Sequence, residues 1–224
     1  TVLINGEVGS IEQNGVSVGV TAAGWSGALR LRKQFVQKWD GSANIGDMRN
    51  TILSPGDRPI DIADISKPDQ GYVLAKFSNI SSTGVRGENT NFVDTDFPLF
   101  RLADVYLMYA ECAVRGATGA TPAQGLDYVN ALRRRAHGGS TSGNIVQGQL
   151  TLDFLLDERS RELHWEAHRR QDLIRFGKFT GGSYNWAWKG NSMNGIALPT
   201  YMKLFPIPSN SLASNRNLTQ NTGY

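Results

Sequence analysis

The stretch that decides the fold is residues 157–179, DERSRELHWEAHRRQDLIRFGKF. With the residues just before it, this stretch carries apolar side chains at the spacing of an α-helix. It therefore predicts one amphipathic helix that Thr151 caps and Gly177 ends. The apolar stripe of that helix consists of Leu152, Leu155, Leu156, Leu163, Ala167 and Ile174.

Charged residues lie inside this apolar stripe, which is unusual for an amphipathic helix. Arg159, Glu166 and Arg170 fall on it, and Glu162 lies at its edge. Burial of an isolated charge is costly, so such groups are expected to be paired. Arg159 and Glu162 are three residues apart. Glu166 and Arg170 are four apart, so both pairs are within reach on one helix. The pattern predicts a structural ion network that holds the helix against its neighbours.

The same run resembles the signature helix of the SusD/RagB family. The matching residues are Asp157, Glu158, Arg159, Glu162, Leu163, Glu166, Arg169, Arg170, Asp172, Leu173, Arg175 and Gly177. Two further segments agree in the family's order, FPLFRLADVYLMYAECA at 97–113 and a C-terminal LFPIP at 204–208 followed by NLTQNTGY at 217–224. The family usually has Gly after the last glutamate of the pattern, where this chain has Ala167. Inside a helix that change is mild.

The resemblance covers residues 90–224 well and residues 1–90 mainly through Asp47-Met48-Arg49 and Lys76-Phe77. SusD-like proteins are about twice as long, and they begin with a signal peptide and a lipid-anchored Cys. The chain is therefore expected to be the C-terminal region of a longer protein whose N-terminal half is absent. The implied fold is mainly α, with tetratricopeptide-like helical hairpins, extensive irregular loops and a few short strands. The expected parts are a loop-rich part at 1–95, a helical core at 96–179 and an irregular C-terminal wrap at 180–224.

A helical hairpin is expected before the signature run. Pro98 suits the first turn of a helix that ends near Gly116, and Thr121 suits the N-cap of a second helix that ends at Gly138. The apolar face of the first helix consists of Leu99, Leu102, Ala103, Tyr106, Tyr109, Ala110 and Ala113. Earlier in the chain, residues 29–39 predict a helix and residues 2–4, 16–20 and 73–77 predict short strands.

Composition and charge exclude several classes of protein. Of the 224 residues, 40% are hydrophobic and 19% are charged, which is ordinary for a globular domain. A formal net charge of +3 gives no nucleic-acid or membrane patch by itself. No apolar run is long enough to predict a transmembrane helix. Cys112 is the single cysteine, so an internal disulfide is excluded, and its apolar surroundings in the sequence predict a small core residue.

Two patterns suggest metal or nucleic-acid binding and are better explained as structural. His164 and His168 have the spacing of zinc ligands on a helix, but a zincin needs Glu after the first His, where Trp165 stands. Two solvent-facing histidines and no metal are therefore expected. No motif for another cofactor was found. Arg133-Arg134-Arg135 lies in the last turn of a predicted helix, where cations complement the dipole, so no nucleic-acid site is expected.

Glu158, Glu162 and Glu166 raise the possibility of glycosidase acid/base chemistry. A glycosidase pair must face an open cleft across a sugar. These three glutamates lie on one predicted helix among arginines, which favour the ionised form and remove the role of proton donor. A structural role is therefore predicted, and no catalytic residue is assigned.

Tryptophans in a polar, glycine-flanked segment form the candidate binding site. The segment Tyr184-Asn185-Trp186-Ala187-Trp188-Lys189-Gly190-Asn191 offers aromatic faces on which a pyranose could stack, and its Asn and Lys side chains could bond sugar hydroxyls. The alternative is that the tryptophans anchor an irregular loop on the core. Trp25, which lies between two glycines, is a second candidate. The candidate ligand-binding residues are Trp25, Tyr184, Asn185, Trp186 and Trp188.

The resemblance implies a function at the cell surface. SusD-like proteins are outer-membrane lipoproteins that bind glycans without catalysis and deliver them to a TonB-dependent, SusC-like barrel transporter. The expected partners are a glycan and that transporter, and the membrane is contacted only through a lipid anchor outside this chain. Two alternatives stay open, a helical-repeat scaffold for protein–protein interaction and a glycan hydrolase.

Overall fold

The computed structural model describes residues 10–13, 16–19, 30–54, 58–67, 69–74, 76, 81, 83–85, 88 and 96–224. In this part of the chain the structure is mainly helical, with two small antiparallel sheets of two strands each. The prediction of a mainly α fold with a few short strands is confirmed. The strand expected at residues 2–4 lies outside the described residues. No described helix is both long and apolar enough to cross a membrane.

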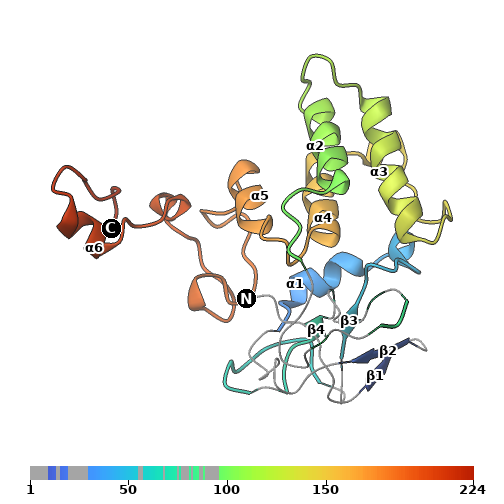
Figure 1. Cartoon of the computed structure of the whole chain (residues 1–224), viewed down its shortest axis with the longest axis horizontal. Helices are drawn as coiled ribbons and strands as arrows, with labels where there is room; N and C mark the ends of the chain where they lie inside the picture. The colour runs from blue at the N-terminus through green and yellow to red at the C-terminus, as the bar shows by residue number, and fades with distance from the viewer. Residues whose placement is uncertain are drawn as a thin grey trace. The chain divides into compact units, whose positions relative to one another are not determined.

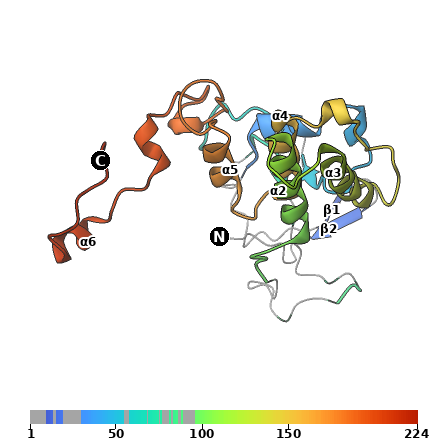
Figure 2. The ribbon, with the colours of Figure 1, turned by 90° about the horizontal axis from the view of Figure 1, so that it is seen from above.

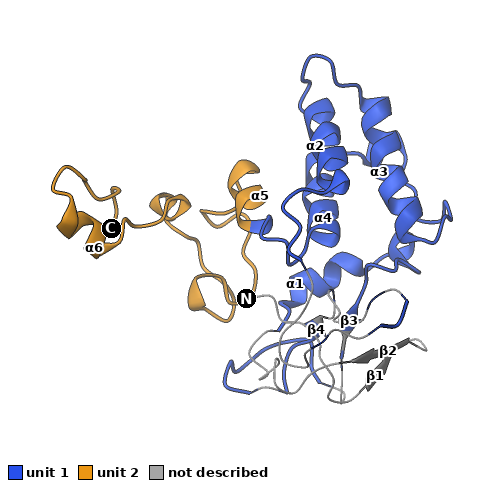
Figure 3. Ribbon diagram, in the orientation of Figure 1, with its two compact units in different colours: residues 1–169 blue, residues 170–224 orange. Residues whose placement is uncertain are grey.

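The chain divides into two compact units, Thr1–Arg169 and Arg170–Tyr224 (Figure 3). The division falls inside helix α5 (Arg169–Arg175). Every buried hydrophobic side chain among the described residues lies in unit 1, so unit 1 holds the apolar core. The three-part organisation expected from the sequence, with boundaries at 95 and 179, remains a prediction.

Three helices form the core of unit 1. They are α2 (Leu102–Val114), α3 (Pro122–Ala136) and α4 (Leu152–Glu162). α2 and α3 lie side by side as a hairpin, and α4 packs against α2 (Figures 1 and 2). Where α2 meets α3, a Cβ on Gly125 would lie 3.2 Å from the Cα of Ala110, so small residues let the two backbones approach. The core cluster consists of Ala103, Leu107, Ala110, Val129, Leu132, Ile145, Leu150, Leu155 and Leu163.

Local signals end these helices where the sequence predicted. The Thr121 hydroxyl accepts a hydrogen bond from the backbone N–H of Gln124 at 3.3 Å and caps α3. The Thr151 hydroxyl accepts one from the N–H of Phe154 at 3.1 Å and caps α4. Beyond the end of α2, Gly116 has a φ of +76°, a backbone conformation that favours glycine.

The start of α2 and its outer face differ from the prediction. The helix begins at Leu102 rather than at Pro98, because Arg101 is extended, with φ −131° and ψ 142°. Leu99 and Leu102, which were expected on the buried face, are exposed. Cys112 is also exposed rather than in the core, because it lies on the α2 face opposite the buried one.

Short strands lie in the N-terminal part of unit 1. β1 (Ser10–Gln13) pairs antiparallel with β2 (Val16–Gly19). β3 (Ile52–Leu53) pairs antiparallel with β4 (Val73–Leu74). Of the strands expected at residues 16–20 and 73–77, residues 16–19 and 73–74 are strands in the described part of the chain.

The first helix of unit 1 is shorter than the predicted 29–39. It consists of α1 (Lys33–Val36) and the 3-10 helix η1 (Gln37–Trp39). Leu31, Phe35 and Trp39 are buried, as their four-residue spacing predicted. Two further 3-10 helices of unit 1 are η2 (Ser42–Asn44) and η4 (Gln147–Gln149).

The signature run is broken, so the prediction of one continuous helix was wrong. α4 ends at Glu162, and α5 begins at Arg169. Between them, Trp165 and Ala167 have φ values of +62° and +63°. A right-handed helix cannot pass through residues in the left-handed region. Ala167 is therefore exposed in a turn, at the position where the SusD/RagB pattern usually has Gly.

Unit 2 is built from turns and short helices. Besides α5, it contains η5 (Lys189–Asn191), η6 (Thr200–Lys203) and α6 (Ser209–Ser214). The guanidinium of Arg170 lies 4.8 Å from the ring centroid of Phe179 and 4.1 Å from that of Phe205. Its Nη2 also donates to the carbonyls of Met202 and Lys203. One arginine of the signature run therefore holds the chain around the LFPIP segment.

The two C-terminal family segments bind each other. The Gln220 amide accepts a hydrogen bond from the N–H of Ile207 at 2.8 Å and donates to the carbonyl of Ile207 at 3.0 Å. The Tyr224 hydroxyl donates to the carbonyl of Leu204 at 2.8 Å, and its ring packs edge-on against Tyr201. These contacts join the LFPIP segment to the C-terminal NLTQNTGY segment.

Candidate functional site

The candidate binding residues of unit 2 lie in a closed loop. The N–H of Gly181 donates to the carbonyl of Leu198 at 2.8 Å and forms an antiparallel bridge. We call residues 181–198 the aromatic loop. Inside it, the backbone N–H of Lys189 donates to the carbonyl of Trp186 at 3.0 Å, and the backbone N–H of Ile196 donates to the carbonyl of Lys189 at 3.1 Å. Backbone bonds therefore fix the shape of the segment that carries the candidate residues.

The side chain of Lys189 organises the aromatic loop from inside. Lys189 is buried, and its ammonium donates to the carbonyl of Tyr184 at 2.9 Å. The Gly181 carbonyl and the Asn185 side-chain oxygen lie 3.4 Å from the same nitrogen. An ammonium has three donors, so these oxygens replace the water that burial removes. The expectation that this lysine bonds sugar hydroxyls was wrong, because its charge is used within the loop.

Two of the candidate rings lie together. The ring centroids of Tyr184 and Trp186 are 5.5 Å apart, with 35° between their planes. Tyr184, Trp186 and Trp188 are half-buried, and Asn185 is exposed. Each ring is therefore partly packed and partly open to solvent. Trp188 has a φ of +64° and precedes η5. Trp25, the fifth candidate, lies outside the described residues.

Glycine is required at two positions of the aromatic loop. Gly195 has a φ of +72°, and a Cβ there would overlap the carbonyl oxygen of Trp186. Gly190 has a φ of +65°, and a Cβ there would lie 2.5 Å from the Cγ1 of Ile196. Any residue larger than glycine would therefore displace the backbone of Trp186 at the first position and the side chain of Ile196 at the second.

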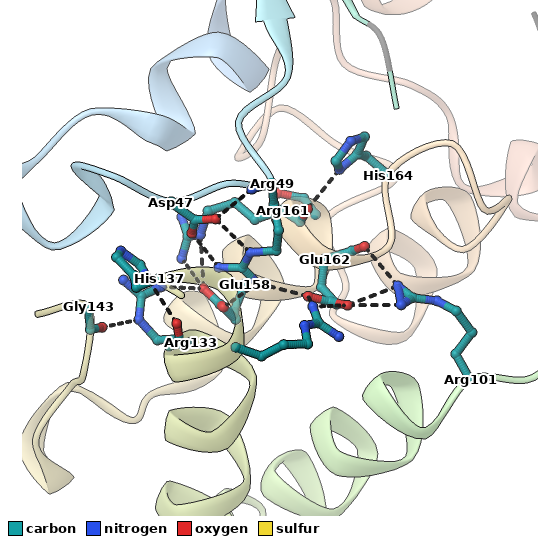
Figure 4. A network of polar contacts seen from close by, with 12 residues as sticks. Asp47, Arg49, Arg101, Arg133, His137, Gly143, Glu158, Arg161, Glu162 and His164 are labelled. Atoms are coloured by element: carbon teal, nitrogen blue, oxygen red, sulfur yellow. Dashed lines mark hydrogen bonds and ion pairs between the residues drawn. The ribbon is translucent and has the colours of Figure 1, made fainter. Parts of the chain in front are cut away.

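The glutamates of the signature run lie in a buried ion network (Figure 4). Glu158 is 0% exposed. One of its oxygens accepts from Arg133 and Arg161, each at 2.8 Å, and the other accepts from Arg49 at 2.9 Å. Burial by itself would raise the pKa of Glu158, but the charges of the three arginines hold it well below its ordinary value. Glu158 is therefore an ionised structural group.

Glu162 accepts hydrogen bonds from three guanidinium groups, one of which, that of Arg49, also binds Glu158. Arg101 lies 2.9 Å from one oxygen, while Arg135 and Arg49 lie 2.7 Å and 3.0 Å from the other. Burial would raise the pKa of Glu162, but the hydrogen bond and charge of Arg135 and the charge of Arg49 lower it. Arg135 comes from the three-arginine run, which therefore contacts carboxylates at the end of α3.

Glu166, in the turn after α4, is bound by two cations of distant segments. Arg101 Nε donates to it at 2.8 Å, and the ammonium of Lys76 is in direct contact. The same ammonium donates to the carbonyls of Glu162 at 3.1 Å and His164 at 2.7 Å. Burial lowers the pKa of Lys76, against the opposing effect of Glu166. Lys76 thus holds the turn between α4 and α5.

The predicted ion network is confirmed, but its predicted partners were wrong. Arg159 pairs with Asp104 of α2 at 2.7 Å rather than with Glu162. Glu166 binds Arg101 and Lys76 rather than Arg170, because the helix has ended before residue 166. The missed partners come from segments far away in the sequence. Arg49 and Lys76 belong to the short matches that the family pattern gave before residue 90, which was the available signal.

His164 is buried rather than solvent-facing, so that prediction was wrong. It is 8% exposed, its Nδ1 lies 2.7 Å from the carbonyl of Arg161, and its ring packs against Phe35 and Trp39. Burial lowers the pKa of His164 to about 3, and the charge of Lys76 adds to the effect. Within the described ranges, no group of three or more His, Cys, Asp or Glu side chains is arranged to hold a metal ion.

Comparison with known proteins gives the same family as the sequence pattern. The SusD family model matches residues 24–224. The starch-binding protein SusD of Bacteroides thetaiotaomicron is 38% identical over 182 residues, which are 80% of this chain and 31% of that protein. A SusD-like protein of Formosa agariphila is 37% identical over 132 residues, which are 56% of this chain and 24% of that protein. The chain thus spans less than a third of the length of these relatives.

Solved structures agree with these matches. A SusD superfamily protein from Bacteroides vulgatus matches with a TM-score of 0.58 and 25% identity, over 87% of this chain and 39% of that one. One from Parabacteroides distasonis matches with a TM-score of 0.53 and 26% identity, over 86% of this chain and 41% of that one. On the family match over residues 24–224, the related sequences and these folds, the chain belongs to the SusD family.

Proposed function

We propose that this chain is part of a non-catalytic glycan-binding protein of the cell surface and that the aromatic loop contributes to its binding site. The observation that carries the proposal is a loop held in shape from inside by Lys189, with three aromatic side chains left half open to solvent. The relative with 38% identity over 80% of this chain is named a starch-binding protein.

The residues of the loop suit a sugar. A pyranose presents a face of C–H groups that stacks on an aromatic ring, and Tyr184 and Trp186 offer two rings 5.5 Å apart. The exposed amide of Asn185 has two N–H donors for sugar hydroxyls, while its oxygen faces the Lys189 ammonium. Trp188 and Trp25 complete the proposed set of ligand-binding residues. A few polar groups around an apolar surface are typical of small-molecule sites.

The state of the signature glutamates supports a binding role over the alternative of a glycan hydrolase. A glycosidase needs a carboxylic acid that still holds its proton near neutral pH. The pKa values of Glu158 and Glu162 are lowered by arginines, and both side chains are buried. Neither group has a proton to give to a leaving sugar.

The role of the full-length protein rests on the family resemblance. In this proposal it is anchored by lipid in the outer membrane, faces the cell exterior and delivers glycan to a TonB-dependent, SusC-like transporter. In the same proposal neither nucleic acid nor a cofactor takes part. The remaining alternative is a helical-repeat scaffold for other proteins, which would bind no glycan.

The experiment is a glycan-panel screen of the full-length protein followed by calorimetry on single variants. Trp186→Ala and Trp188→Ala should each weaken glycan affinity by about 1–3 kcal/mol, as an aromatic anchor does, while the melting temperature changes little. Trp165→Ala is the control, because Trp165 is also half-buried but lies in unit 1. If glycan binds and no change in the loop alters affinity, the loop is not the site. If no glycan binds, the scaffold alternative is favoured.

A further inference from the structure

The aromatic loop has one charged residue, Lys189, and its charge is used inside the loop. The ammonium donates to the carbonyl of Tyr184 at 2.9 Å, and the carbonyl of Gly181 and the side-chain oxygen of Asn185 lie 3.4 Å from it. An ammonium has three hydrogens to donate, and these oxygens can accept all of them. Lys189 therefore has no donor left for a ligand outside the loop.

The exposed polar side chains of the aromatic loop are uncharged. They are Ser183, Asn185, Asn191 and Asn194. Their hydroxyl and amide groups include both hydrogen-bond donors and acceptors, as do the hydroxyl groups of a sugar. A carboxylate or sulfate group only accepts hydrogen bonds, and proteins bind such groups most strongly with Arg and Lys. The loop therefore has polar groups that suit hydroxyls, and its own sequence has no second cation for an acidic group.

Unit 2 also has basic residues outside the loop, which by themselves would favour an acidic ligand. Asp172 is the only acidic residue in the sequence of unit 2, whereas six residues are Lys or Arg. Arg170 binds backbone carbonyls, and Arg175 pairs with Asp172 at 2.9 Å. Lys203 and Arg216 are exposed and follow the loop in the chain. Attraction by exposed charges is screened by salt, so an experiment can separate it from contacts within the loop.

We propose that the aromatic loop selects neutral glycans over glycans that carry carboxylate or sulfate groups. This inference rests on the proposed function, because it names the class of sugar that the same loop would bind. A neutral pyranose stacked on Tyr184 or Trp186 would meet uncharged polar groups. An acidic sugar at the same place would lose water around its charge without gaining a cation, which is costly. The selection therefore comes from the cost of an unpaired charge.

Calorimetry on the full-length protein tests the selection. The neutral probes are oligosaccharides of glucose, mannose, xylose and fructose, and the acidic probes are oligogalacturonate, oligoalginate and sulfated derivatives of the neutral set. The sulfated derivative of the best neutral probe should bind about tenfold or more weakly than its neutral parent. Affinity for that neutral probe should change less than about twofold between low salt and about 0.5 M NaCl, because its binding includes no ion pair that salt can screen.

Substitution of one ring tests whether the loop makes the selection. In Trp186→Ala, affinity for the neutral probe should fall about tenfold or more while affinity for its sulfated derivative changes little, so the ratio of the two affinities shrinks. Trp186→Phe should keep the ratio, because a phenyl ring still offers a face for stacking, and it replaces the alanine variant if that variant fails to fold. The control is Trp165→Ala, at a half-buried position of unit 1, which should leave both affinities unchanged.

The possible failures can be told apart. Binding of an acidic probe as tightly as its neutral parent, or more tightly, would overturn the selection and leave glycan binding in place. A neutral preference that is unchanged in Trp186→Ala would overturn the assignment of the selection to the aromatic loop. If no probe binds, neutral or acidic, the proposed function itself fails and the inference fails with it.

Discussion

The ion network of unit 1 and the aromatic loop of unit 2 are held together in different ways. The network joins buried carboxylates to arginines and a lysine from distant segments of the chain. The loop is held by its own backbone and by one lysine within it, and its rings stay half open. The family's most recognisable residues are therefore scaffold. The candidate site lies in unit 2, whereas the buried hydrophobic side chains of the described residues lie in unit 1.

The largest effect is expected on folding stability, when a carboxylate of the buried ion network is removed. Glu158→Ala would leave Arg133, Arg161 and Arg49 in a buried setting without their shared carboxylate. Loss of one partner from a buried ion group costs roughly 3–5 kcal/mol. Chemical denaturation of the full-length protein measures this loss. Asp153→Ala, at an exposed position in the first turn of α4, is the control and should cost less than about 1 kcal/mol.

The second prediction tests whether Lys189 holds the aromatic loop in the shape that binds glycan. Lys189→Met removes the ammonium that binds the carbonyls of Gly181 and Tyr184. Buried acceptors without a donor cost about 1–3 kcal/mol, so the loop should lose order. We expect glycan affinity to fall by about tenfold or more, with unfolding of unit 1 unchanged. Lys203→Met, at an exposed position of the same unit, should leave affinity unaltered. If the glycan affinity of Lys189→Met is unchanged, the aromatic loop does not contribute to glycan binding.

The third effect concerns pH and belongs to unit 1. The pKa of His164 is about 3 in the folded protein, against an ordinary 6.5, so the unfolded chain binds a proton that the folded chain does not. Stability is therefore complete above pH 6.5 and falls as pH drops below it, by about 2 kcal/mol at pH 5. The pKa values of Glu158 and Glu162 are lowered from an ordinary 4.5 in the folded protein. Their stabilising effect is therefore complete above pH 4.5, and they add to the loss of stability only when the pH falls below that value.

His164→Gln should flatten the stability profile between pH 6.5 and 4.5, because glutamine does not titrate. Denaturation midpoints across this window measure the effect, and wild type and variant should converge in slope above pH 6.5. An identical slope in both proteins between pH 6.5 and 4.5 would show that His164 is not kept neutral by burial. The profile below pH 4.5 should remain steep in both, since the glutamate network is intact.

Elements with local signals could be predicted from the sequence. The N-caps Thr121 and Thr151 act within three residues, so their positions were found. Long-range pairing could not be predicted, because no spacing rule connects Arg49 or Lys76 to carboxylates more than 80 residues away. Burial of His164 was missed for the same reason, since Phe35 and Trp39 come from a distant helix.

The candidate site was only partly predictable. Composition marked Tyr184, Trp186 and Trp188, because aromatic residues in a polar loop stand out. Composition could not predict that the Lys189 side chain is buried inside the loop. Its ammonium binds backbone carbonyls such as that of Tyr184, whose positions depend on how the loop folds. The break between α4 and α5 has no signal in the residue types themselves. The only sign was the family's usual Gly at the position of Ala167, which a local helix pattern outweighed.

The smallest effect tests the turn at Ala167, where the scaffold departs from its family. Ala167 has a φ of +63°, a region that costs an L-residue roughly 1–2 kcal/mol and glycine almost nothing. Ala167→Gly should therefore stabilise the protein by about 0.5–1 kcal/mol, after the greater flexibility of glycine in the unfolded chain is subtracted. Ala131→Gly, in the right-handed interior of α3, is the control and should destabilise by about 1 kcal/mol. Denaturation midpoints of the two variants should shift in opposite directions. If both variants lose stability, Ala167 lies in an ordinary helix, and the signature run is continuous after all.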